Sequence, residues 1–166
     1  WGGGGPRRQR LCTRPGGGTR AAREGSRWTT GPRCQDLAQT AWSLAKSGER
    51  NMTSLKTIAQ DAVSSVRGCR IPDAGKLAWA FASARVRALG FFSALALEVE
   101  ARRRELTPFI VANLAWCLAK LSVADVRLLR VLALEGCAKI GAFNPQDCTN
   151  LAWSFAVLDL AEASLF

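Results

Sequence analysis

Apolar residues recur at helical spacing along the chain from residue 31 onward. In one segment the apolar positions are Val111, Leu114, Ala115, Leu118 and Ala119. Residues three and four positions apart share one face of an α-helix, so this pattern predicts a helix that buries one side. No segment of the sequence shows the alternation of apolar and polar residues that a half-buried strand requires. The predicted fold class is therefore all-α.

The helical pattern itself repeats. Trp42, Trp79, Trp116 and Trp153 follow one another at intervals of 37 residues. An alanine precedes each tryptophan, a leucine or phenylalanine follows two residues later, and a second alanine follows three residues later. Matched flanks at a fixed period of this length indicate tandem units that each stack on the next. We therefore predict an α-solenoid of tandem two-helix repeats with a 37-residue period.

Two helices are expected in each repeat. Thr107-Pro108 and Asn144-Pro145 each place a capping side chain before a proline at the first helical position. The second helix carries apolar residues thirteen, sixteen and twenty positions after tryptophan: Leu55, Ile58 and Ala62, then Phe92, Leu95 and Val99, then Leu129, Leu132 and Gly136. The solenoid is expected to span 31–166, with repeats at 31–67, 68–104, 105–141 and 142–166, the last one truncated.

The first thirty residues differ from the repeats in composition. They contain Gly2–Gly5, Gly16–Gly18, seven arginines and one acidic residue, with almost no aliphatic side chains. Such a segment buries too little apolar surface to offset the entropy lost on ordering, so we predict that 1–30 is a disordered Gly/Arg-rich tail. Three interpretations stay open: a linker or gene-model edge, a remnant of an Arg-rich transit segment, and an arm that contacts RNA.

Composition narrows the function classes. The 166 residues include no histidine, which excludes His-based catalytic triads, His-ligated metals and imidazole bases. The sequence has no Walker A loop and no C-x-x-C pair. We therefore expect a protein that is not an enzyme and that binds neither a metal nor a cofactor. The apolar stretches are too short to cross a membrane, so no membrane partner is expected.

Charge and cysteine content suggest a partner and a compartment. The net charge of +10 favours an anionic partner such as nucleic acid. Most of that excess lies in the tail, however, so it is weak support for a basic solenoid. Most of the six cysteines lie among alanines and leucines, where a free thiol behaves as a small apolar residue. A compartment that keeps thiols reduced therefore fits better than secretion.

On a helical wheel, the positions seven and three before tryptophan, tryptophan itself and the position four after it form one mixed stripe along the outer side of the first helices. The position three residues before each tryptophan is polar in every repeat, but its identity changes: Gln39, Lys76, Asn113 and Asn150. Amide side chains can both donate to and accept from a base edge, so this position suits a modular reader of RNA bases. An ordinary solvated helix face has the same pattern and remains the alternative.

The repeated tryptophans and the cations beside them complete the candidate site. Packing between adjacent repeats is the favoured role for Trp42, Trp79, Trp116 and Trp153, with stacking on RNA bases as the alternative. Cations recur at matched positions after tryptophan, and we expect them to contact phosphate. These cations are Lys46 and Lys120, four positions after tryptophan, and Arg50 and Arg87, eight positions after it.

The segments NLAWCLAKL at 113–121 and NLAWSFAVL at 150–158 resemble the helical repeats of octotricopeptide and heptatricopeptide proteins. These belong to a wider group with the FAST-kinase-like, RAP-domain-bearing organellar proteins. The segments are also similar to the helical subunit family of the kinetoplastid RNA-editing substrate-binding complex. The resemblance covers 31–166 and is looser at Gln39-Thr40 and at Lys76, where the repeats depart from Asn-Leu and from Asn.

The resemblance implies an α-solenoid that binds single-stranded RNA and supports its processing, stability, editing or translation in mitochondria. The mitochondrial matrix is the expected location, with the plastid as the alternative, and protein partners in a ribonucleoprotein complex are implied. A protein-interaction scaffold of the armadillo or tetratricopeptide type is the competing hypothesis. A third one is a fragment of an enzyme whose catalytic domain follows Phe166.

Overall fold

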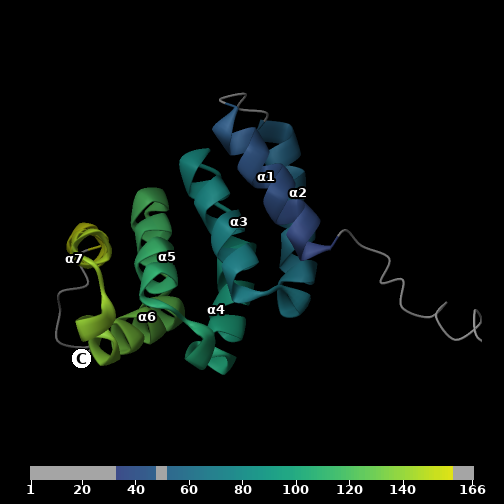
Figure 1. Ribbon diagram of the computed structural model, residues 1–166. Coiled ribbons are helices and arrows are strands. Elements are labelled where there is room, and N and C mark those ends of the chain that lie inside the picture. The colour runs from purple at the N-terminus through teal and green to yellow at the C-terminus, as the bar shows by residue number, and fades with distance from the viewer. Residues whose placement is uncertain (1–32, 48–51, 159–166) are drawn as a thin grey trace, which may run out of the picture. The chain divides into compact units, whose positions relative to one another are not determined.

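The computed structural model describes residues 33–47 and 52–158 (Figure 1). Every described residue belongs to one compact unit, Gly31–Phe166. The predictions for the tail at 1–30 and for Arg50 therefore lie outside the described residues. Within the described ranges all regular elements are helical and none is a strand, so the all-α fold class is confirmed.

The helices begin at regular intervals. Those that carry the tryptophans start at Cys34, Ile71, Pro108 and Pro145, so each start lies 37 residues after the one before. The elements in chain order are α1 (Cys34–Lys46), α2 (Met52–Ser65), η1 (Val66–Gly68), α3 (Ile71–Ser83), α4 (Leu89–Ala101), η2 (Arg103–Glu105), α5 (Pro108–Leu121), α6 (Val126–Ala138), η3 (Ile140–Ala142) and α7 (Pro145–Val157). The elements labelled η are single 3₁₀ turns.

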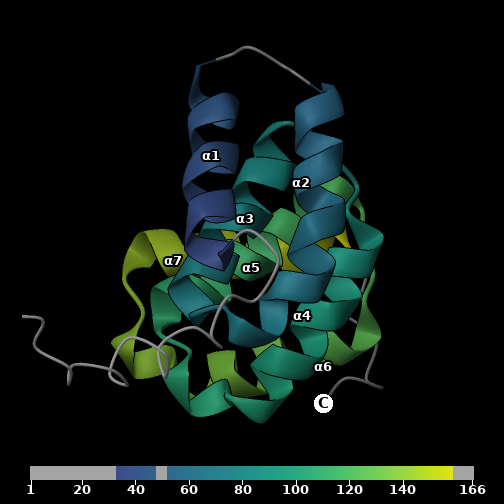
Figure 2. The same cartoon turned by 90° about the vertical axis from the view of Figure 1, so that its right-hand side faces the viewer.

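The α-helices of the Gly31–Phe166 unit form two layers. In one layer α1, α3, α5 and α7 pack against one another in chain order, and in the other α2, α4 and α6 do the same. Figure 2 looks along this succession, with α1 and α2 nearest the viewer. Each tryptophan-bearing helix therefore has an equivalent helix beside it, and residues at matched positions of successive helices come close together.

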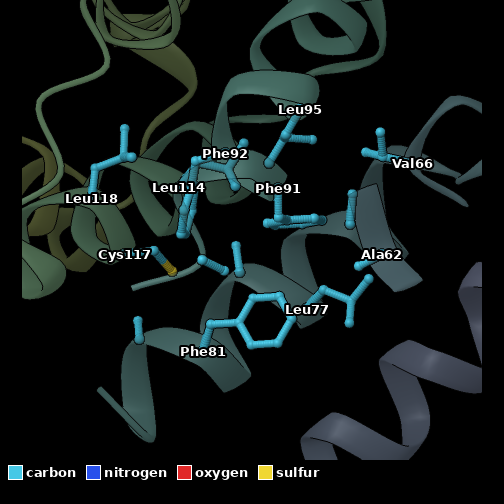
Figure 3. Close-up of a cluster of buried hydrophobic side chains, with 14 of the residues drawn as sticks. Ala62, Val66, Leu77, Phe81, Phe91, Phe92, Leu95, Leu114, Cys117 and Leu118 are labelled. Atoms are coloured by element: carbon cyan, nitrogen blue, oxygen red, sulfur yellow. The ribbon is translucent and has the colours of Figure 1, made fainter. Parts of the chain in front are cut away.

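Aliphatic and aromatic side chains fill the space between the layers (Figure 3). Phe91 lies at the centre, with its ring centroid 5.3 Å from that of Phe81 and 5.4 Å from that of Phe92, both in edge-to-face geometry. All nine residues expected to line the buried face of the second helices are buried, which confirms that part of the prediction. These contacts hold the two layers together, and the outer faces of the helices take no part in them.

The predicted helix ends are confirmed where the structure describes them. The Thr107 hydroxyl accepts a hydrogen bond from the Ile110 amide at 3.3 Å, and the Asn144 side chain accepts one from the Asp147 amide at 2.8 Å. Both caps precede a proline, which has no amide hydrogen to satisfy. α5 ends at Leu121, and the next residue, Ser122, adopts a left-handed conformation with φ of 50°.

Long cationic side chains tie the end of a repeat to its start. The Arg102 guanidinium donates to the Cys69 carbonyl oxygen at 2.7 Å, and the Lys139 ammonium donates to the Leu106 carbonyl oxygen at 2.7 Å. Arg102 also donates two hydrogen bonds to Glu105, and these lower the pKa of that carboxyl group. These cations serve the fold, so they are not available for an external anion.

The cysteines do not all behave as expected. Cys34 and Cys69 form a disulfide that joins the start of α1 to the segment before α3. The expectation of free thiols is therefore wrong for this pair, because stacking of the first two repeats brings together two cysteines that lie 35 residues apart in sequence. Cys117, Cys137 and Cys148 are free, and burial raises the pKa of the Cys117 thiol far above its usual value.

Candidate functional site

Two adjoining pockets lie along the layer formed by α1, α3, α5 and α7. The first encloses about 470 Å³ and the second about 150 Å³, and Trp79, Phe109 and Asn113 line both. Trp42 and Lys76 line only the first, while Trp116 and Asn150 line only the second. We call this surface the aromatic groove and define it by Trp42, Lys76, Trp79, Phe109, Asn113, Trp116 and Asn150. All seven belong to the stripe expected from the helical periodicity.

The tryptophans contribute to the core and to the groove together. Trp42, Trp79 and Trp116 are half-buried, and Trp79 and Trp116 pack against the core cluster. Trp153 is 44% exposed and lines neither pocket of the groove. The partial burial is consistent with repeat packing and still leaves ring surface at the groove, so neither of the two predicted roles is excluded for the first three tryptophans.

Lysines cover the tryptophan rings in alternate repeats. The Lys46 ammonium lies 4.9 Å from the Trp42 ring centroid, and the Lys120 ammonium lies 5.9 Å from that of Trp116. These distances permit a cation–π attraction that holds each ammonium at the edge of the groove. The residue four positions after Trp79 is Ser83, which carries no charge. The Trp79 ring is therefore the one in the middle of the groove without a cation at that position.

The two asparagines present different hydrogen-bonding groups. The Asn113 side chain donates from Nδ2 to the Gly75 carbonyl oxygen at 3.3 Å, which leaves its Oδ1 to accept. The Asn150 Oδ1 instead accepts from the Gln146 side chain at 3.0 Å, which leaves its Nδ2 to donate. Gln39 is exposed at the matched position of α1. The side-chain atom without a hydrogen bond is therefore the acceptor Oδ1 in one repeat and the donor Nδ2 in the next.

Carboxylates partly balance the charge along the groove. The Lys76 ammonium lies 3.6 Å from Asp73 Oδ1, and Asp73 is buried and also pairs with Arg70 at 2.8 Å. Asp147, also buried, lines the second pocket and accepts a hydrogen bond from Asn144 at 2.8 Å. In the part of the chain that the structure describes, Lys46 and Lys120 have no ion pair with a carboxylate.

Arg87, which we expected to contact phosphate beside the lysines, is not part of the aromatic groove. It lines a different pocket between α2 and α4, and its guanidinium donates to the Ser122 carbonyl oxygen at 3.3 Å. The reason is that Arg87 follows the end of α3 and lies in the connection to α4, where the helical wheel of α3 no longer applies.

Phe109 is the groove residue that the sequence-based site omitted. Its side chain is 65% exposed although it is large and apolar, and it lies at the border of the two pockets. The position seven residues before tryptophan belongs to the predicted stripe, but the other repeats place Gln35, Pro72 and Gln146 there. Because no aromatic residue recurs at this position, the repeat pattern alone did not single out Phe109.

Comparisons with known protein families, with curated protein sequences and with solved structures find no significant match to this chain. Over residues 33–47 and 52–158, no helix is both long enough and apolar enough to cross a membrane. The same residues contain no group of three or more Cys, Asp or Glu side chains placed to hold a metal ion.

Proposed function

We propose that the Gly31–Phe166 unit is an α-solenoid of tandem two-helix repeats with a 37-residue period, and that it binds single-stranded RNA along the aromatic groove. The recurrence of helix starts every 37 residues and the packing of equivalent helices in two layers support the solenoid. A solenoid of this kind displays matched residues side by side, which suits a ligand that itself repeats, such as a nucleic acid strand.

The observation that carries the RNA proposal is the arrangement of Phe109, Trp79 and Asn113 where the two pockets meet. An exposed phenylalanine gains little for the fold, whereas a base can stack on its face. An amide oxygen beside the ring can accept a hydrogen bond from an edge of the stacked base. In this proposal Phe109 and Trp79 stack bases, and Asn113 and Asn150 read them as acceptor and donor.

Phosphate contacts fall to the lysines at the edge of the groove. Lys46 and Lys120 lie over tryptophan rings at matched positions two repeats apart, so they can follow one strand along the layer. Lys76 lies between them, although its charge is shared with Asp73. The cellular context, an organellar ribonucleoprotein in mitochondria or alternatively plastids, rests on the resemblance of the NLAW segments and is part of the proposal.

Replacing Phe109 tests the RNA proposal. The affinity of the full chain for a short single-stranded oligo(U) is measured by fluorescence anisotropy at about 50 mM salt, where electrostatic attraction is strong. We expect Phe109→Ala to weaken binding by roughly 5- to 150-fold, which corresponds to about 1–3 kcal/mol for one stacked base. Because Phe109 is exposed, the variant should fold like the parent chain.

Leu134→Ala is the matched control, since Leu134 is an exposed apolar residue of α6 in the other layer. It should bind oligo(U) like the parent chain. A parent chain that does not bind oligo(U), or equal affinities for the two variants, would contradict the proposal. Retained RNA binding in both variants together with peptide binding in the aromatic groove would instead favour a protein-interaction scaffold.

A further inference from the structure

A second groove lies between α2 and α4, in the layer that does not carry the tryptophans. It encloses about 540 Å³, and we call it the α2–α4 groove. Its exposed apolar side chains are Met52 (37% exposed), Val63 (41%) and Leu89 (52%). Met52 and Val63 are separated by three turns of α2 and so lie on the same face of that helix. Three aliphatic anchors are thus exposed along one groove.

The described lining of the groove is basic. Lys56, Arg85 and Arg87 belong to it, and over residues 33–47 and 52–158 no acidic residue does. Among the residues of known placement, none of these three cations forms an ion pair with a carboxylate. Cations beside exposed apolar surface favour a ligand that combines apolar and acidic groups.

The start of α4 adds to the positive potential. The residue before α4 is Ala88, so the helix begins without a side-chain cap, and both Ala88 and Leu89 line the groove. The first amide groups of a helix lack partners within the helix and carry partial positive charge. The Leu89 amide already donates to the Arg87 carbonyl oxygen at 3.0 Å, so a carboxylate from outside can accept hydrogen bonds from the amides of Gly90 and Phe91 while it faces the cations of the groove.

The corresponding groove between α4 and α6 has a similar size, about 570 Å³, but carboxylates pair with two of the three arginines that line it. Arg127 lies 3.7 Å from Glu100, and Arg103 lies 4.0 Å from Glu135. Arg130 is the third lining arginine. Within the described residues, most cations of this groove therefore have a carboxylate partner, whereas those of the α2–α4 groove have none.

In the groove between α4 and α6, a side chain of the chain itself caps the start of the helix. Asp125, the residue 37 positions after Ala88, caps α6 by accepting from the Leu128 amide at 2.9 Å. Both grooves have an exposed apolar residue at the first position of the helix: Val126 lies 37 positions after Leu89 and is 63% exposed. The two grooves thus share their apolar pattern and differ in whether a carboxylate is present.

Arg85 occupies a position that favours glycine. Its φ of 58° lies in the left-handed region, which is unfavourable for residues with a Cβ atom. The residue 37 positions earlier in the sequence is Gly48, which carries no such penalty. Ser122, 37 positions after Arg85, adopts the same conformation with φ of 50°, so the left-handed residue belongs to the end of the tryptophan-bearing helix.

We propose that the α2–α4 groove docks an acidic amphipathic helix of a partner protein. Apolar side chains of that helix pack on Met52, Val63 and Leu89, and its carboxylates pair with the groove cations and cap the start of α4. RNA fits this groove less well, because its exposed apolar side chains are aliphatic and its one lining ring, Phe91, is buried, so no ring is offered for base stacking. The solenoid can then bind RNA on one layer and a protein on the other.

A displayed library of random peptides, selected against the full chain, tests this proposal. We expect the enriched peptides to be acidic, with apolar residues three and four positions apart, and to lose at least about tenfold in affinity for the Leu89→Asp variant. Val126→Asp is the matched control, because it makes the same change 37 positions later and should bind these peptides like the parent chain. An aspartate at the first position of a helix is compatible with folding.

A second variant, Arg85→Gly, removes the guanidinium, and glycine is compatible with the left-handed backbone. This variant should therefore fold, and its affinity for the enriched peptides should be lower than that of the parent chain. The proposal is overturned if no acidic amphipathic peptide is enriched, or if Leu89→Asp and Val126→Asp bind such peptides equally. It is also overturned if Leu89→Asp lowers the affinity for oligo(U) as much as Phe109→Ala does, because the groove would then belong to RNA.

Discussion

The aromatic groove and the α2–α4 groove both contain cations, but they expose different uncharged side chains. Trp79, Phe109 and Asn113 give the aromatic groove ring faces and an amide, whereas Met52 and Leu89 give the other groove flexible aliphatic surface. Ring faces and amides suit nucleobases, and aliphatic surface flanked by cations suits an acidic amphipathic helix. One repeated sequence pattern therefore presents two chemically distinct surfaces.

The difference arises from the position of each residue within the repeat. The first helix of a repeat carries tryptophan and the polar position before it, and these face outward from one layer. In the three repeats whose second helix the structure describes, that helix begins with an exposed apolar residue: Met52, Leu89 and Val126. Because equivalent helices stack side by side, each kind of residue is collected on its own layer and the two surfaces stay separate.

The largest expected effect tests whether the tryptophans serve the fold or the groove. Trp116 is half-buried against the core and Trp153 is 44% exposed, so their truncation should differ in cost. We expect Trp116→Ala to lower the free energy of unfolding by about 3 kcal/mol and Trp153→Ala by about 1 kcal/mol. Urea unfolding followed by circular dichroism measures both. Equal losses would mean that α7 buries its tryptophan as deeply as α5 does.

A smaller effect is expected at Asn113, which bonds to Gly75 on the neighbouring helix. Asn113→Ala removes this hydrogen bond and should cost about 1 kcal/mol of stability. Asn150→Ala loses only a bond to Gln146 of its own helix and should cost less. Both variants should change the preference among homopolymeric RNAs if the amides read bases. An unchanged preference in both would remove the asparagines from the RNA site.

The smallest effect concerns the salt dependence of RNA binding. Each phosphate neutralised on a single strand contributes roughly −0.7 to the slope of log affinity against log salt. Lys46→Ala combined with Lys120→Ala should therefore make the slope less negative by about 1.4. The control pair is Arg67→Ala with Arg104→Ala, two exposed cations that neither line the groove nor lie over one of its tryptophan rings. The tail is common to all variants, so the differences report on the groove alone.

The sequence predicted the features that depend on a single helix. The helix caps at Thr107 and Asn144 and the buried faces of the second helices could be derived from local spacing, because capping and periodicity act within a few residues. For the same reason, the sequence indicated that the stripe residues which line the aromatic groove share one face of their helices. A helical wheel identifies the residues that share one face of a helix. Because equivalent helices have similar neighbours, the same face is exposed in each of them.

Features that depend on which helices become neighbours could not be derived in this way. The disulfide between Cys34 and Cys69, the bond from Asn113 to Gly75 and the bond from Arg87 to Ser122 each join residues 35 to 38 positions apart. These partners meet only when one repeat stacks on the next, and single-helix periodicity contains no information about that register. Phe109 was omitted for a different reason, since it occurs in only one repeat.

The most direct test of the central claim is to locate RNA on the full chain. A short oligonucleotide of 4-thiouridine is crosslinked to the protein by ultraviolet light, and the crosslinked peptides are identified by mass spectrometry. The account predicts crosslinks at Trp79, Phe109 and Trp116 that disappear with an excess of oligo(U). Crosslinks confined to α2, α4 and α6, or to the tail alone, would contradict the assignment of the aromatic groove to RNA.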